Sequence, residues 1–506
     1  MTINNIIIVG GGSSGWLTAA YLSNNLPHQV KIALIESSEM PTIGVGEGTQ
    51  PFTMPFLQDC GLEPADWMKK TDATYKYGVE LIGWSDDPVF IDNDTQEMAV
   101  LGPNIMFHNY WLSKKCGAKE YINSMPAYIL AKHNKAPKAN HPDLDYTPGY
   151  TEQSCDAVHF NAHDIISTLK AHCKDRITYI DDLIVEVITD EQGVTGLKTK
   201  NNGILTADLY IDCSGFDSLL LEKSLGVKFI PVNDVLLCNR AVAIPKQYTN
   251  KKEEMHPYTK AIAMDAGWRW TIPTYSRIGN GYVYCDDFIS SEKAEEALRK
   301  SINEWSAPAN HIKMKTGIHE HIAYKNVYAI GLSAAFAEPL EATGITFTTK
   351  AISNLVQVLN NSNGQWNDDI RNFLTNKYQV MVNEIVNFLF LHYKLAPKDD
   401  TPFWKATKDI PYSSGCLPGV GIKNVLDKFV PNPPNTLIEN GYFEMFHVGQ
   451  WFSLLYGYDV YNKYVYNIDK HIVNYGDWVN TMYKDRTKYA LNFFPNQYEY
   501  LKELYG

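Results

Sequence analysis

A glycine-rich segment near the start of the chain has the residue types and the spacing to bind a phosphate group. The segment Gly10-Gly11-Gly12-Ser13-Ser14-Gly15 follows the apolar run 5–9, which is typical of a buried parallel strand. Residues 16–25 then predict a helix, and residues 30–35 predict a second strand that ends at Glu36. This order of strand, glycines, helix, strand and acid predicts a dinucleotide site.

Each part of this unit has a role at such a site. Gly10 and Gly12 would let the backbone approach a pyrophosphate, and Gly15 would let the helix pack on the strand. The N-terminus of the helix would offer N–H groups to the phosphates, while Glu36 would accept hydrogen bonds from ribose hydroxyls. The candidate cofactor-binding residues here are Gly10, Gly12, Ser13, Ser14, Gly15 and Glu36.

The glycine motif alone fits NAD and FAD equally well. Two later segments, 207–215 and 327–333, favour a bound flavin, because each predicts a strand that ends in a turn of small residues. Such strand ends from separate parts of a chain line one extended cofactor. We therefore expect FAD, and the chain shows no second dinucleotide motif for a nicotinamide.

A pair of tryptophans stands in the pattern Trp268-x-Trp270-x-Ile272-Pro273. On a strand, side chains two positions apart share a face, so both indoles would lie on one side of a sheet. The alternative is an ordinary aromatic strand in the protein core, with both indoles on one face. The rigid Ile-Pro ending and the size of the indoles favour a shaped wall beside a ligand.

Lys76 lies in the aromatic, strand-like run 74–79, where an unpaired buried charge would be costly. An ordinary surface lysine is the alternative.

His159 and His163 have the i, i+4 spacing of two metal ligands on a helix, but no Glu follows His159 and no third ligand is evident. We expect these histidines to pack within a helix, and we expect no metal.

Composition narrows the class of protein. The 506 residues are long enough for two or three structural units, and 45% hydrophobic with 20% charged residues is typical of an ordinary globular protein. A net charge of −12 without a basic block argues against nucleic acid. The eight cysteines form no metal or disulfide pattern, and neither a leader nor a long apolar span is present. We expect a cytoplasmic protein with no membrane partner.

Beyond these motifs, periodic apolar residues predict a helix that starts near Thr343 and further helices from Asn367 onward. We expect one module at 1–365 that contains the dinucleotide unit, and a mostly helical region at 366–506.

Over essentially its full length the chain resembles the flavin-dependent halogenases of the tryptophan halogenase family. The resemblance rests on an ordered set of motifs: 10–15, 43–49, Lys76 ahead of Trp84, 159–163, 211–215, 268–273, 338–345 and 400–404. It implies an α/β fold with an FAD-binding Rossmann-type unit like that of flavin monooxygenases, a second sheet-containing substrate region and a helical C-terminal region. It also implies reduced FAD from a separate NAD(P)H-dependent reductase, with oxygen and halide as co-substrates. The module at 1–365 would then bind FAD and line the halide and substrate sites, and the region at 366–506 would cover the substrate site.

The same resemblance assigns roles to individual residues. Lys76 and Glu341 match the catalytic pair, and Thr343 with Gly344 match the halide site. Lys76 would receive hypohalous acid through a tunnel and halogenate an electron-rich ring. Trp268, Trp270, Ile272 and Pro273 would separate flavin from substrate, and Leu332 and Ile345 join the candidate FAD contacts.

Two departures from the family pattern bear on specificity. Ala342 stands where many relatives carry Ser, so bromide or iodide should be accepted at least as well as chloride. Phe446 stands where relatives that act on free tryptophan place a clamping Trp, so an indole or phenol ring is the expected substrate. Candidate substrate-lining residues are Phe443, Phe446 and Trp451.

Two rival functions fit the same fold. A flavin-dependent aromatic hydroxylase would need its substrate near the flavin and would have no use for Lys76. A non-catalytic flavin-binding protein would have no reason to keep Lys76, Glu341, Thr343 and Gly344. The sequence therefore favours a halogenase, and it leaves homo-oligomerisation open.

Overall fold

A six-stranded sheet forms the base of the molecule and carries the glycine-rich loop. The computed structural model describes residues 1–39, 46–93, 107–115, 117–137, 157–412, 444–461 and 470–506. In spatial order the sheet consists of β20 (Ala323–Tyr324), β21 (Val327–Ala329), β12 (Leu209–Asp212), β1 (Asn5–Val9), β2 (Lys31–Glu36) and β8 (Thr178–Asp181). Every pairing from β21 to β8 is parallel, so the loops after these strands meet at one edge.

A larger sheet of seven strands lies beyond this base and carries the tryptophan pair. Its spatial order is β18 (Asn310–Lys313), β14 (Arg240–Lys246), β17 (Ile278–Tyr284), β16 (Gly267–Pro273), β15 (Thr259–Met264), β5 (Gly78–Ile82) and β6 (Val89–Asp92). Only β15 and β5 pair in parallel. β16 lies in the interior of this sheet, which explains its β-branched and aromatic residues.

Three small sheets complete the β structure. β7 (Val158–Asn161) pairs with both β3 (Gly46–Gly48) and β4 (Thr74–Tyr75), which brings three distant parts of the chain together. The other two small sheets are β11 (Ile204–Leu205) with β10 (Gly193–Thr199) and β9 (Ile184–Asp190), and β13 (Phe229–Pro231) with β19 (Gly317–His319) and β22 (Ala335–Phe336).

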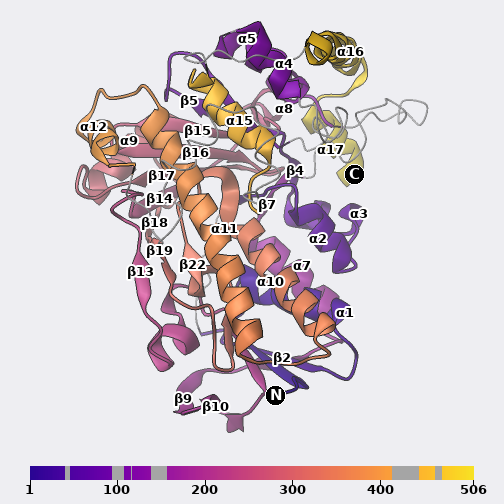
Figure 1. The fold of residues 1–506 in the computed structure, drawn as a ribbon, viewed down its shortest axis with the longest axis vertical. Helices are drawn as coiled ribbons and strands as arrows, with labels where there is room; N and C mark the ends of the chain where they lie inside the picture. Colours follow the sequence, from indigo (N-terminus) through magenta and orange to yellow (C-terminus); the bar gives the residue numbers. More distant parts are fainter. Residues whose placement is uncertain (40–45, 94–106, 116, 138–156, 413–443, 462–469) are drawn as a thin grey trace.

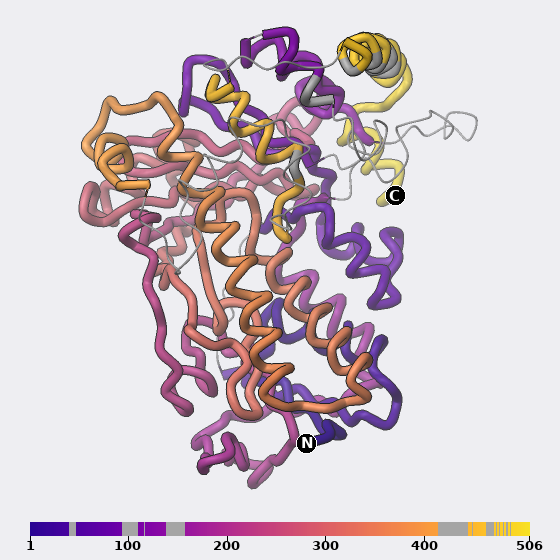
Figure 2. The backbone as a smooth tube through the Cα atoms, in the orientation of Figure 1, coloured from indigo at the N-terminus to yellow at the C-terminus, as the bar shows by residue number. Residues whose placement is uncertain are grey.

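The helix α11 (Asp368–Leu395) runs lengthwise through the molecule beside α10 (Thr343–Asn361), as Figures 1 and 2 show. Every residue from Glu384 to Tyr393 is buried, so this part of α11 is covered on all sides. The helix α1 (Ser13–Asn25) packs against α10 and against α7 (Ala162–Cys173).

The remaining described helices lie around these layers. They are α2 (Thr53–Asp59), α3 (Pro64–Trp67), α4 (Phe107–Lys114), α5 (Ala118–Ile122), α6 (Pro126–Lys132), α8 (Lys251–Glu254), α9 (Ser291–Ile302), α12 (Pro402–Asp409), α15 (Val448–Gly457), α16 (Lys470–Phe493) and α17 (Gln497–Tyr505). Among the described residues, no helix has both the length and the apolar character needed to cross a membrane.

The sequence predictions hold for the main elements, with two differences. α1 begins at Ser13 instead of Trp16, because the glycine loop turns directly into the helix. The prediction that His159 and His163 pack within one helix is wrong, since His159 lies on β7 and α7 begins at Ala162. Asn161 caps α7 by accepting the N–H of His163. The ordered elements within the described part of 366–506 are helices, while the boundary at 365 stays a prediction.

Candidate active site

The glycine-rich loop joins β1 to α1 and leaves the start of the helix open. Gly10 has a φ of 114°, a conformation that favours glycine. A methyl group on Gly15 would lie 1.9 Å from the Gly10 carbonyl oxygen, so the close contact of helix and strand requires Gly15. No atom lies within 4 Å of such a group on Gly12, and no side chain caps the first turn of α1. This arrangement suits an anionic group at the helix N-terminus.

Glu36 lies at the end of β2, directly against this loop. Its carboxylate accepts hydrogen bonds from Lys170 Nζ at 2.8 Å, the Tyr179 hydroxyl at 2.9 Å and Trp16 Nε1 at 3.3 Å. The Lys170 ammonium also lies 4.0 Å from the centre of the Tyr179 ring. Glu36 is therefore held in a fixed orientation beside Gly11 by side chains that the sequence pattern did not single out.

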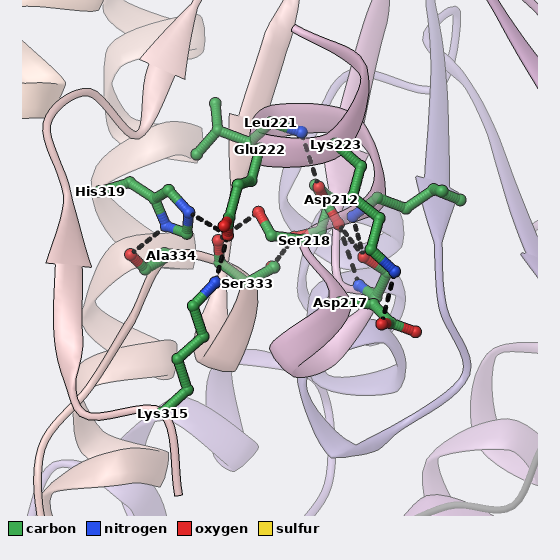
Figure 3. Close-up of polar contacts among 12 residues, drawn as sticks. Asp212, Asp217, Ser218, Leu221, Glu222, Lys223, Lys315, His319, Ser333 and Ala334 are labelled. Carbon is green, nitrogen blue, oxygen red and sulfur yellow. Dashed lines mark hydrogen bonds and ion pairs between the residues drawn. The ribbon is translucent and has the colours of Figure 1, made fainter. Parts of the chain in front are cut away.

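The loops that follow β12 and β21 are tied together by buried hydrogen bonds (Figure 3). The Asp212 carboxylate accepts the N–H groups of Leu220 and Leu221, at 2.8 and 3.0 Å, in the π-helical turn η6 (Leu219–Ser224). Ser218 Oγ donates to the Ser333 carbonyl at 3.0 Å, and Ser333 Oγ donates to the Asp212 carbonyl. Both loops are thus rigid at the edge of the sheet where Leu332 lies in η7 (Gly331–Ser333).

The two tryptophans lie on one face of β16, as predicted. Trp268 and Trp270 are both buried, and their ring centres are 6.3 Å apart. Trp270 lies over Gly281 of β17, where a methyl group would be 2.0 Å from its ring. Trp268 Nε1 donates to Glu338 Oε2 at 3.2 Å, so this indole is anchored to the segment that leads to Glu341.

Glu338 is a buried carboxyl group in this segment. Its Oε2 accepts hydrogen bonds from both Trp268 Nε1 and the Tyr393 hydroxyl. Burial raises the pKa of Glu338 to about 7, and these hydrogen bonds offset only part of that rise. Glu338 therefore joins β16, α11 and the segment that leads to Glu341 at one point.

Lys76 is completely buried between β4 and β5. Its Nζ donates to the Thr49 carbonyl at 2.7 Å. Thr74, two residues earlier, donates to the Pro273 carbonyl at 2.6 Å, which fixes this strand to the end of the tryptophan segment. A surface position for Lys76 is thereby excluded.

His159 lies close to Lys76 and is held between two threonines. Its ring nitrogens lie 3.2 Å from Thr74 Oγ1 and 2.9 Å from Thr259 Oγ1. Burial, followed by the charge of Lys76, lowers the pKa of His159 well below its usual value, so this ring is neutral. In the part of the chain that the structure describes, no group of three metal-ligating side chains gathers around it or elsewhere.

Glu341 has an unusual backbone conformation that the structure holds in place. Its φ is 64° and that of Ala342 is 53°, two consecutive left-handed residues that are not glycine. Gln50 Nε2 donates to the Glu341 carbonyl at 2.6 Å. Gln450 of α15 in turn donates to Gln50 Oε1 at 3.0 Å, so a chain of buried amides connects the C-terminal region to Glu341.

The two oxygens of the Glu341 carboxylate have different surroundings. Oε1 lies 3.2 Å from His392 Nε2, and both side chains are fully buried. Oε2 is buried and has no hydrogen-bond partner among the described residues. Burial and the nearby Glu341 charge raise the pKa of Tyr458 well above its usual value, so this neighbouring phenol stays protonated.

The helix α10 begins directly after this turn and presents an open N-terminus. Its cap residue Ala342 provides no side-chain hydrogen bond, and its first turn contains no acidic residue. Thr343 is buried, whereas Gly344 is exposed with open space beside it. An anion at this point would meet backbone N–H groups and the positive end of the helix dipole.

An aromatic cluster lies next to His392. The Phe388 ring is 4.1 Å from that of Phe446 and 4.7 Å from that of Trp451. Glu384 accepts the N–H groups of residues 444–446 at 2.8 to 2.9 Å, which fixes Phe446 against α11. Phe443 lies outside the described residues.

The sequence profile of the tryptophan halogenase family matches residues 5–472. The chain belongs to the tryptophan halogenase family. Its members are flavin-dependent halogenases, enzymes that use oxygen, halide and reduced FAD supplied by a separate flavin reductase. The open glycine loop and the rigid strand-end loops of this halogenase fit FAD.

Individual relatives are similar to this halogenase along most of its length. The tryptophan 6-halogenase ThaL of Streptomyces albogriseolus is 33% identical, over 81% of this halogenase and 79% of its own length. The tryptophan 7-halogenase RebH of Lentzea aerocolonigenes is 30% identical, over 82% and 80%. The structure of the tryptophan 6-halogenase SttH from Streptomyces toxytricini superposes with a TM-score of 0.86 at 29% identity, covering 99% of both chains.

The fold of this halogenase brings most of the predicted site residues together. Two adjacent residues link Lys76 and Glu341. The Thr49 carbonyl accepts a hydrogen bond from Lys76 Nζ, and Gln50 Nε2 donates to the Glu341 carbonyl. The sequence patterns missed Gln50, Gln450 and His392 as parts of this site. His392 had a signal, since it continues the apolar spacing 385, 388, 389 on α11 with an ionisable residue.

Replacing Glu338 with Gln is expected to remove part of the pH dependence of the halogenase's folding stability. Burial raises this carboxyl pKa from 4.5 to about 7, so within that window the folded protein keeps a proton that the unfolded chain releases. Stability therefore falls as pH rises through the window, by roughly 2–3 kcal/mol for this group. Urea unfolding at about pH 5 and about pH 8 measures the difference.

Glu296→Gln, on the exposed side of α9, is the matched control and should leave the pH dependence as it is. Equal pH dependence in wild type and Glu338→Gln would show that the buried carboxyl does not hold this proton.

Proposed function

We propose that this halogenase generates hypohalous acid beside the flavin, passes it through a tunnel to Lys76, and halogenates an electron-rich aromatic ring there. The observation that carries this proposal is the complete burial of Lys76, with its Nζ bonded to the Thr49 carbonyl. A fully buried lysine is costly for stability, which favours a functional reason for it.

The first stage requires the cofactor and halide to bind close to each other. Bound reduced FAD would supply two electrons and oxygen would supply the oxygen atom, so that reduced FAD, oxygen, a halide ion and a proton would give oxidised FAD, water and hypohalous acid. Gly10, Gly12 and the start of α1 would hold the pyrophosphate, and Glu36 would face the ribose. The N–H groups of Thr343 and Gly344 would hold the halide.

The second stage takes place on the other side of the tryptophan pair. Trp268 and Trp270, with Ile272 and Pro273, would form the wall that keeps the organic substrate from the flavin. Lys76 would then present the halogen either as a haloamine or as hypohalous acid hydrogen-bonded to its ammonium group. Glu341, whose Oε2 lacks a partner among the described residues, would take the proton from the halogenated ring.

The substrate class follows from the ring chemistry and from the aromatic cluster. Phe446 and Trp451 pack with Phe388 next to His392, and flat aromatic side chains suit a flat substrate ring. The relatives named above are tryptophan halogenases, which favours an indole-type ring. We propose an indole or a similarly electron-rich ring, such as a phenol.

Replacing Lys76 with Met is expected to abolish halogenation while flavin oxidation continues. Met keeps the apolar length of the side chain but has no amine, so product should fall by about 100-fold or more. Mass spectrometry of reactions with FAD, NADH, a flavin reductase, bromide and indole measures the product. Lys260→Met removes another half-buried lysine on β15 and is the matched control that should keep activity. Full activity in Lys76→Met would refute the role of the amine.

Halide preference is expected to depend on residue 342. Ala342 caps the open helix without a hydroxyl, which leaves a roomier and less polar site than Ser would. With equal concentrations of chloride and bromide, the wild type should form at least as much brominated as chlorinated product. Ala342→Ser should shift the ratio toward chloride. Mainly chlorinated product from the wild type would contradict this explanation.

A further inference from the structure

Glu341 forms a buried pair with His392, a residue that lies outside the motifs that mark the family resemblance. Their side chains are fully buried, and His392 Nε2 lies 3.2 Å from Glu341 Oε1. His392 comes from the buried middle of α11, and its ring is also packed edge-on against Trp84 and Phe388. The pair is therefore held in a fixed geometry away from the protein surface.

A backbone carbonyl determines which nitrogen of His392 carries a proton. His392 Nδ1 lies 2.8 Å from the Phe388 carbonyl oxygen. A carbonyl oxygen only accepts hydrogen bonds, so Nδ1 must be the N–H donor. The other nitrogen, Nε2, faces Glu341 Oε1.

Only two proton arrangements satisfy this second contact. Either Nε2 carries a proton and donates to an ionised Glu341, or Glu341 is protonated and donates to a neutral Nε2. In both arrangements the two side chains share a single proton between Nε2 and Oε1. The pair as a whole can accept one further proton, at Glu341 Oε2, which has no partner among the described residues.

We propose that His392 is a positioning residue that makes Glu341 able to accept the ring proton, so that the two side chains act as one proton-accepting dyad. This proposal rests on the proposed halogenation at Lys76. When halogen has bonded to the ring carbon, the C–H bond breaks and its electron pair returns to the aromatic ring. The proton bonds to Glu341 Oε2, while the shared proton resides on His392 Nε2.

Among the neighbours of Glu341, His392 is better suited than Tyr458 or Gln50 to hold the shared proton. Tyr458 keeps its own proton, because burial and the Glu341 charge raise its pKa. Gln50 contacts only the backbone carbonyl of Glu341, and an amide does not titrate. Glu341 is 2% exposed, so water has little direct access.

The test is the rate of proton loss from the ring in His392→Gln. Gln retains an N–H donor for Glu341 but cannot carry an additional proton. Single-turnover bromination is measured separately with ordinary indole and with ring-deuterated indole. We expect about 10-fold slower product formation in the variant, and a rate ratio of ordinary to deuterated indole that rises from about 1 to about 2 or more.

The matched control is Trp84→Phe, which disturbs packing on the same imidazole ring but leaves the proton path intact. It should show no isotope effect, even if it is slower. A His392→Gln enzyme that is as fast as wild type, or slow without an isotope effect, would overturn the dyad. Absence of brominated indole and of any other halogenated ring with the wild type would instead refute the proposed function.

Discussion

Two hydrogen bonds made by adjacent residues hold the Lys76 amine and the Glu341 backbone in place. The Thr49 carbonyl accepts from Lys76 Nζ, and the Gln50 amide donates to the Glu341 carbonyl. Each contact is buried, where an unpaired polar group is expensive, so neither side chain can leave its partner at low cost. The short segment after β3 therefore sets the positions of the amine and the carboxylate relative to each other.

The same segment allows a strained turn to persist. Glu341 and Ala342 adopt left-handed conformations that cost about 1 kcal/mol or more each, and they direct the chain into the open start of α10. Contacts made by the C-terminal region also support this turn. Glu384 holds the backbone of 444–446 against α11, and Gln450 on the following helix holds Gln50. The C-terminal region thus helps to hold the turn at Glu341 and Ala342 in place.

Local patterns were sufficient to predict the base of the fold and the shared face of the tryptophan pair. The β1-loop-α1-β2 unit follows from residues that are adjacent in the chain, because glycine spacing and apolar runs act over short distances. The shared face of Trp268 and Trp270 follows from strand geometry in the same way. The pattern of His159 and His163 misled the prediction, since a spacing of four residues indicates a shared face only if both lie in one helix.

The sequence by itself determined the dinucleotide unit, the family and the residues of the motifs, because each depends on side-chain types at fixed spacing. Only the tertiary structure decided that Lys76 is buried, that Gln50 reaches the Glu341 carbonyl and is itself held by Gln450, and that His392 faces the Glu341 carboxylate. These contacts join residues that are tens to hundreds of positions apart. Their formation depends on how the sheets and α11 pack, which no local pattern contains.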